Sequence, residues 1–188
     1  MSRGAFFLSF LALVCTVSCS NRAAQLPVYD SVPGFTATDS SGRPFTRQDM
    51  SGSAWVVDFI YTNCPAECPL MSSRMRRVAH DLENETGVRF LSISVDPARD
   101  TPAALEAFAK RYGGASARWK FITGTPEMVH LLAFETFHVG DVLGKIEHST
   151  KFMAVDKAGR IRGYYASGDP QDIAKLKADV KSLAEVKP

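Results

Sequence analysis

Hydrophobic residues along this chain follow two periodicities, and each predicts a different kind of element. Residues 54–61 and 88–95 are near-continuous apolar runs, which are typical of strands buried on both faces of a sheet. Between them, apolar residues recur every three or four positions, which predicts the buried face of a helix. The residues of this stripe are Met71, Met75, Val78 and Leu82. The pattern therefore predicts a strand–helix–strand unit.

Shorter patterns predict the remaining elements. Apolar segments around turn sequences predict one β-hairpin at 35–38 and 44–46, a second at 151–155 and 161–165, and a short strand at 119–122. Three further helices are expected to begin at a proline after Thr or Asp, because these residues cap helices and proline suits the first turn. These starts are Thr101-Pro102, Thr125-Pro126 and Asp169-Pro170, and the second of these helices is expected to end near Ala133.

The alternation of strands and helices predicts an α/β fold. A pair of cysteines follows the first long strand, so the specific expectation is a thioredoxin-like fold. Such a fold would have a central mixed sheet flanked by helices, with an N-terminal β-hairpin. In open α/β sheets, functional sites form at the carboxyl ends of strands. Cys64 falls at such an end.

The first 19 residues have the pattern of a secretory signal peptide. Arg3 supplies a positive start, and the apolar stretch 6–17 is shorter than the roughly 20 residues that span a bilayer. The sequence Thr16-Val17-Ser18-Cys19 resembles a bacterial lipobox, with Cys19 as the lipidated first residue of the mature protein. Ordinary cleavage and an uncleaved anchor are the alternatives. Residues 20–33 are expected to form a tether and residues 34–188 the folded domain.

This leader predicts a location in the bacterial cell envelope, on the extracytoplasmic face and attached to the membrane through the N-terminus. Disulfides can persist there. The chain has 188 residues, of which 45% are hydrophobic, which is sufficient for one domain with a full core. Its net charge is +2, and no basic stretch is interleaved with aromatic residues, so nucleic acid is not an expected partner.

The segment Cys64-Pro65-Ala66-Glu67-Cys68-Pro69 is where chemistry is expected. Proline pushes the preceding residue out of the helical region and suits a first helical position, so a helix is expected to begin at Pro69 with Cys68 near its N-cap. Free N–H groups and the positive helix end would then favour thiolates, the form that binds metals and attacks disulfides. The pair could share one metal ion, close one disulfide or be purely structural.

A histidine could complete a metal site with the two cysteines. In a thioredoxin-like fold the loop that enters the hairpin at 151–165, which contains the penultimate strand, approaches the cysteine turn, and this favours His148 over His138 as a third ligand. His80 and His130 lie off the apolar faces of their helices and are expected to be solvated. Asp96 lies at the end of a neighbouring strand. It either contacts the metal ligands without binding the metal itself, or it is a turn and cap residue of its own loop.

Three motifs in this order strongly resemble the Sco/SenC family, the copper proteins that assist assembly of cytochrome c oxidase. The motifs are Tyr61–Pro69, Ser94–Pro102 and His148-Ser149. The resemblance extends over roughly 32–187 and implies one copper ion bound by Cys64, Cys68 and His148. It also implies that copper passes to the binuclear copper site of oxidase subunit II. Another copper chaperone is a further candidate partner.

Several functions are compatible with these residues. Two thiolates and an imidazole suit Cu(I), which accepts three ligands, and Cu(II) is a second candidate, whereas Zn²⁺ usually requires a fourth ligand. The preferred function is a copper-binding chaperone. The alternative is a thiol–disulfide oxidoreductase that uses Cys64 and Cys68 as a redox-active pair to reduce the cysteines of the oxidase copper site. A thiol peroxidase or a structural module on the same fold explains the motifs less well.

Overall fold

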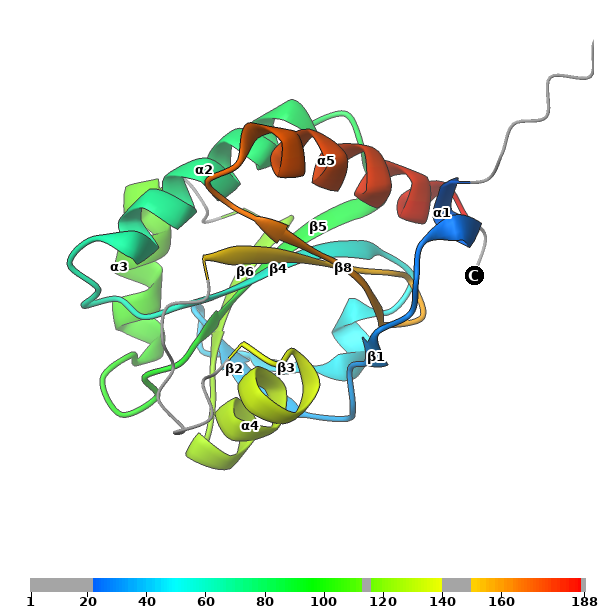
Figure 1. The fold of residues 1–188 in the computed structure, drawn as a ribbon. Coiled ribbons are helices and arrows are strands. Elements are labelled where there is room, and N and C mark those ends of the chain that lie inside the picture. Colours follow the sequence, from blue (N-terminus) through cyan, green and yellow to red (C-terminus); the bar gives the residue numbers. More distant parts are fainter. Residues whose placement is uncertain (1–21, 113–115, 140–149, 187–188) are drawn as a thin grey trace, which may run out of the picture.

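The computed structural model describes residues 22–112, 116–139 and 150–186 of the chain. These residues form an eight-stranded sheet with the strand order β1-β8-β7-β4-β5-β6-β2-β3 (Figure 1). The strands are β1 (Asp30–Ser31), β2 (Thr36–Asp39), β3 (Pro44–Thr46), β4 (Ala54–Ile60), β5 (Val88–Ser94), β6 (Trp119–Thr123), β7 (Lys151–Val155) and β8 (Arg160–Ala166).

The sheet is mixed, with a parallel centre. Strand β4 pairs with β5 in parallel, β5 pairs with β6 in parallel, and every other pairing is antiparallel. All seven residues of β4 are buried, as expected for a strand covered on both faces. The N-terminal hairpin is confirmed, because β2 and β3 pair with Ala37 opposite Phe45. The predicted α/β fold with a mixed sheet and flanking helices is therefore confirmed.

Helices cover both faces of this sheet. The helical elements are α1 (Arg22–Gln25), α2 (Glu67–Asp81), α3 (Pro102–Tyr112), α4 (Pro126–His130) and α5 (Pro170–Glu185), with a 3-10 turn at Arg47–Met50 and a π-helix at Leu131–Thr136. Helices α2, α3 and α5 pack in one core cluster, and α4 packs in a second cluster on the other face (Figure 1). Within the described residues, no helix is long and apolar enough to span a membrane.

Two helix boundaries differ from the sequence prediction. Helix α2 begins at Glu67, not at Pro69, so Cys68 lies inside the first turn. Proline is tolerated there because the N–H groups of a first turn have no partner inside the helix. Helix α4 ends at His130 and continues as a π-helix to Thr136, about one turn beyond the expected end.

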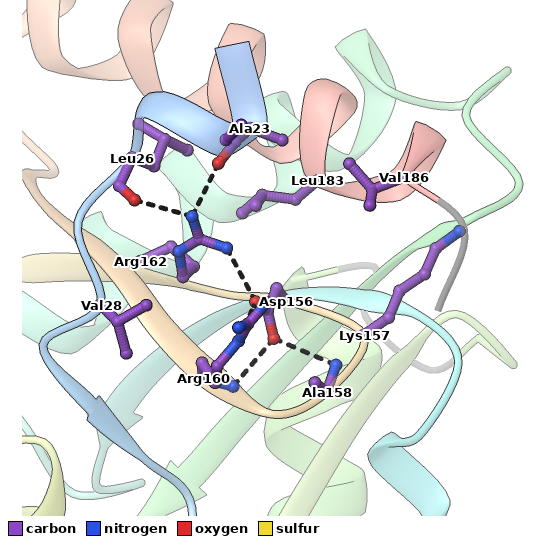
Figure 2. A pocket seen from close by; sticks show the side chains of 11 residues that line it. Ala23, Leu26, Val28, Asp156, Lys157, Ala158, Arg160, Arg162, Leu183 and Val186 are labelled. Carbon is purple, nitrogen blue, oxygen red and sulfur yellow. Dashed lines mark hydrogen bonds and ion pairs between the residues drawn. The ribbon is translucent and has the colours of Figure 1, made fainter. Parts of the chain in front are cut away.

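The N-terminal segment differs most from expectation, because the residues assigned to a tether pack on the domain from Arg22 onward. Helix α1 packs against α5, where Arg22 pairs with the buried Asp179, and β1 adds an edge strand to β8. Figure 2 shows the guanidinium of Arg162 between α1 and the turn joining β7 to β8. It donates to the carbonyls of Ala23 and Leu26 and to the Asp156 carboxylate at 2.6, 2.7 and 2.9 Å.

Candidate metal and redox site at the end of strand β4

The cysteine pair follows directly from the end of β4. The chain leaves the strand at Ile60 and closes a turn in which the Cys64 N–H donates to the Tyr61 carbonyl at 3.2 Å. Helix α2 then starts at Glu67, which brings Cys68 back over the turn. Both cysteine side chains are buried, at 6% and 3% exposure, while Pro65 and Ala66 between them are exposed. The pair therefore lies just beneath the surface.

The two sulfurs are reduced and connected through the first turn of α2. Cys64 and Cys68 are free thiols, and the Cys68 backbone N–H donates to Cys64 Sγ at 3.2 Å. The N-cap residue, Ala66, has no side chain that could accept this bond. The sulfur of Cys64 therefore satisfies an N–H group that would otherwise lack a partner at the helix start.

The two thiols differ in acidity. Burial pushes the pKa of Cys64 upward, but N–H donors from Cys68 and Ala66 outweigh it, and the pKa lies below its ordinary value. Burial raises the pKa of Cys68 far above its ordinary value, and the charges of Cys64 and Asp58 add to this effect. The expectation that the helix start favours thiolate is thus right for Cys64 and wrong for Cys68. Cys64 is therefore the more acidic of the two thiols, and Cys68 is the one that keeps its proton more strongly.

Two further polar residues beside the sulfurs have unusual environments. Burial, and then a hydrogen bond to Cys64, raises the pKa of Tyr61 to about 12. Asp58 lies in the middle of β4 with no exposed surface, and within the described part of the chain neither of its carboxylate oxygens has a hydrogen-bond partner. Burial raises the pKa of Asp58 to about 7. The only signal of Asp58 in the sequence is one acidic residue in an apolar run.

The structure places the other predicted site residues as follows. The Asp96 carboxylate pairs with Arg99 at 2.9 Å, and its charge also contributes to the raised pKa of Tyr61. His148 and Cys19 lie outside the described residues. His138 is largely exposed and its Nδ1 lies 3.0 Å from the Phe134 carbonyl oxygen.

The remaining histidines are solvated, as predicted. His80 and His130 are largely exposed, and each lies 3.3 Å from a glutamate on the surface. In the described ranges, no group of three or more His, Cys, Asp or Glu side chains could hold a metal ion. Cys64 and Cys68 supply two soft donors.

Asp100 is, after Asp58, a second buried residue of the site that was not predicted from the sequence. Asp100 accepts hydrogen bonds from Thr62, two residues before Cys64, and from Ser94 at the end of β5. Asp100 lies in the motif Ser94–Pro102, but a loop aspartate gives no local sign that it is buried. Only the fold brings it to the cysteine turn.

Comparisons with known proteins agree with this geometry. A family model described as SCO1/SenC matches residues 24–185. The SCO1 protein homolog of Bacillus subtilis (strain 168) is 29% identical over 178 residues, which cover 90% of this chain and 91% of that protein. Both the fold class and the family resemblance predicted from the sequence are confirmed.

Solved structures give the same result. A SCO1/SenC family lipoprotein from Bacillus anthracis str. Ames is 30% identical with a TM-score of 0.74, over 83% of this chain and 96% of that chain. BsSco, described as a Sco-family cytochrome c oxidase assembly protein with a disulfide switch, is 29% identical with a TM-score of 0.75, over 86% and 98%. Copper-bound ScoI from Bradyrhizobium japonicum is 22% identical with a TM-score of 0.62, over 80% and 98%, which shows a shared fold.

Proposed function

This chain belongs to the SCO1/SenC family, and we propose that it is a copper-binding chaperone acting in cytochrome c oxidase assembly. The observation that carries the proposal is the pair of reduced, buried cysteines held together at the start of α2. The proposed ligands of one copper ion are Cys64, Cys68 and His148. The family relationship supports the role in oxidase assembly, because BsSco is described as an oxidase assembly protein.

The donor set suits copper as cargo. Thiolates are soft ligands that favour Cu(I), and an imidazole is acceptable to both Cu(I) and Cu(II). The lowered pKa of Cys64 makes this sulfur the first to bind, while Cys68 releases its proton to solvent only when a metal binds it or when it forms a disulfide. A shell of three ligands leaves room for a partner's ligand to enter before the ion leaves. This property suits a carrier better than a permanent metal site.

The proposed acceptor is the binuclear copper site of cytochrome c oxidase subunit II. The proposed location is the extracytoplasmic face of the membrane, with a lipid on Cys19. The lipobox-like sequence supports this location, as does the description of the B. anthracis relative as a lipoprotein. Mass spectrometry of membrane-extracted protein tests it, and an unmodified N-terminus in the membrane fraction would exclude lipidation.

An anaerobic copper titration of the reduced protein tests the ligand set. The variants are Cys64→Ser, Cys68→Ser and His148→Ala, with His130→Ala as the matched control because His130 is a solvated surface residue. We expect tight one-to-one binding in the unmodified protein and the control, and its loss in the three ligand variants. Unchanged affinity in His148→Ala would exclude the three-ligand site.

The unequal acidity of the two thiols favours thiol–disulfide exchange as a second candidate function. A low-pKa sulfur attacks, and a buried sulfur with a high pKa resolves the mixed disulfide. Such a protein would reduce the cysteines of the oxidase copper site before copper enters. Exchange with a disulfide-bonded peptide should need Cys64 and Cys68 but not His148. If His148→Ala slowed exchange as much as it weakened copper binding, the two functions would not be separable.

A further inference from the structure

We propose that Asp100 is a positioning residue for the cysteine pair and that it acts through Thr62. This proposal rests on the proposed function of Cys64 and Cys68. Asp100 has no exposed surface and lies in the loop between β5 and α3. It contacts neither sulfur in any described interaction, so its effect on the site is indirect.

Both carboxylate oxygens of Asp100 are used. Thr62 Oγ1 donates to Oδ1 at 2.6 Å, and the Thr62 N–H donates to Oδ2 at 3.1 Å. Ser94 Oγ also donates to Oδ2, at 2.6 Å. Hydrogen bonds to an ionised acceptor are about twice as strong as neutral ones. One carboxylate therefore joins the ends of β4 and β5 to each other.

Thr62 is the residue through which this connection reaches the sulfurs. It is the second residue of the turn that the hydrogen bond from the Cys64 N–H to the Tyr61 carbonyl closes. The backbone conformation of Thr62 therefore sets the position of Cys64. Asp100 is itself held from the other side, because its own N–H donates to the Asp96 carbonyl at 2.9 Å. The loop between β5 and α3 thus fixes the position of Cys64 relative to Cys68.

This fixed position should matter for copper binding and for disulfide formation alike. In the exchange reaction with glutathione disulfide, the two protein thiols are oxidised to one disulfide and two glutathione thiols are released. Its equilibrium constant measures how well the two sulfurs are held for bonding. A looser turn should lower that constant and also lower the copper affinity. For scale, removing a residue that orients a metal ligand through a hydrogen bond typically lowers metal affinity about 10–100-fold.

The test uses four variants of the full-length protein. Asp100→Asn replaces an acceptor oxygen with a donor, and Thr62→Val removes the hydroxyl while keeping the side-chain shape. Thr62→Ser keeps the hydroxyl and should restore the unmodified behaviour. Asp179→Asn is the matched control, because Asp179 is an equally buried carboxylate that accepts from Tyr165 away from the cysteines. Each is measured by glutathione equilibrium and by Cu(I) competition with a colorimetric chelator.

We expect Asp100→Asn and Thr62→Val to lower both constants about tenfold. Thr62→Ser and Asp179→Asn should stay within about twofold of the unmodified protein. Equal constants in all variants would overturn the proposal, and so would an equal fall in Asp179→Asn, since that would indicate general destabilisation. If Asp100→Asn does not fold, the Thr62 pair decides. The glutathione constant needs no copper, so a failure of the copper-carrier function would not hide the result.

Discussion

The buried carboxylate of Asp58 makes a contribution to the free energy of unfolding that falls as the pH rises from 4 to 7. Asp58 has no exposed surface, and its pKa is raised by burial from 3.8 to about 7. Below pH 4 both the folded and the unfolded chain carry the proton. Between these values the unfolded chain ionises while the folded chain stays protonated, so the unfolded state becomes relatively more favourable. Above pH 7 the full penalty is present.

The size of this penalty follows from the two pKa values. Each pKa unit corresponds to about 1.36 kcal/mol, so the difference between 3.8 and about 7 amounts to about 4 kcal/mol, an order-of-magnitude figure. Asp58→Asn removes the ionisation at nearly constant side-chain shape. We therefore expect the unfolding free energy of the variant, relative to the unmodified protein, to rise by about this amount between pH 4 and pH 8.

Urea unfolding of the reduced protein at a series of pH values measures this difference. Glu106→Gln is the matched control, because Glu106 is a half-exposed side chain in a surface ion pair. Its relative stability should change by only a few tenths of a kcal/mol, as for other surface pairs. A difference between Asp58→Asn and the unmodified protein that stays constant from pH 4 to 8 would refute the reasoning. It would mean that the folded protein accommodates the charge of Asp58.

Two further predictions concern the thiols and the N-terminal segment. Limiting iodoacetamide should modify Cys64 before Cys68, and at a lower pH than it modifies an ordinary thiol, because the pKa of Cys64 is depressed. Peptide mapping measures the order of labelling, and a result in which Cys68 is labelled first would contradict this prediction. Arg162→Met should cost about 3–5 kcal/mol in urea unfolding, since it breaks a buried ion pair. Arg160→Met should cost about 1 kcal/mol or less, because Arg160 pairs with the same Asp156 from a half-exposed position; equal losses would show that burial does not decide the effect.

Local patterns predicted the architecture, and long-range contacts account for what they missed. The apolar runs and X-Pro starts give β4, β5, α3 and α5 close to their observed bounds, since each signal lies within the element itself. The segment from Arg22 to Pro33 is polar and resembles a tether. It is nevertheless held because Arg162, more than 130 residues away, binds its backbone carbonyls. Every residue has a backbone carbonyl, so the residue types do not show which of these carbonyls will accept a hydrogen bond from a distant side chain.

The candidate site divides in the same way. The cysteines and their turn are visible in the sequence, because two prolines and a strand–helix junction surround them. The different acidity of the two thiols is not visible, because it depends on how deeply α2 buries Cys68 and on Asp58 beneath it. Asp100 is likewise hidden, since Thr62 is 38 residues away in sequence.

The placement of α1 limits the distance between the cysteine pair and a membrane to which the N-terminus is attached. The N-terminal segment packs at the end of the sheet where β4 starts, separated from β4 by β8 and β7, and the cysteines follow the other end of β4 (Figure 1). The seven residues of β4 span about 20 Å at roughly 3.3 Å per residue. With a lipid on Cys19, only two residues would separate the anchor from α1. The copper site would then stay within a short distance of the bilayer, and only partners exposing their acceptor residues within that distance would meet it.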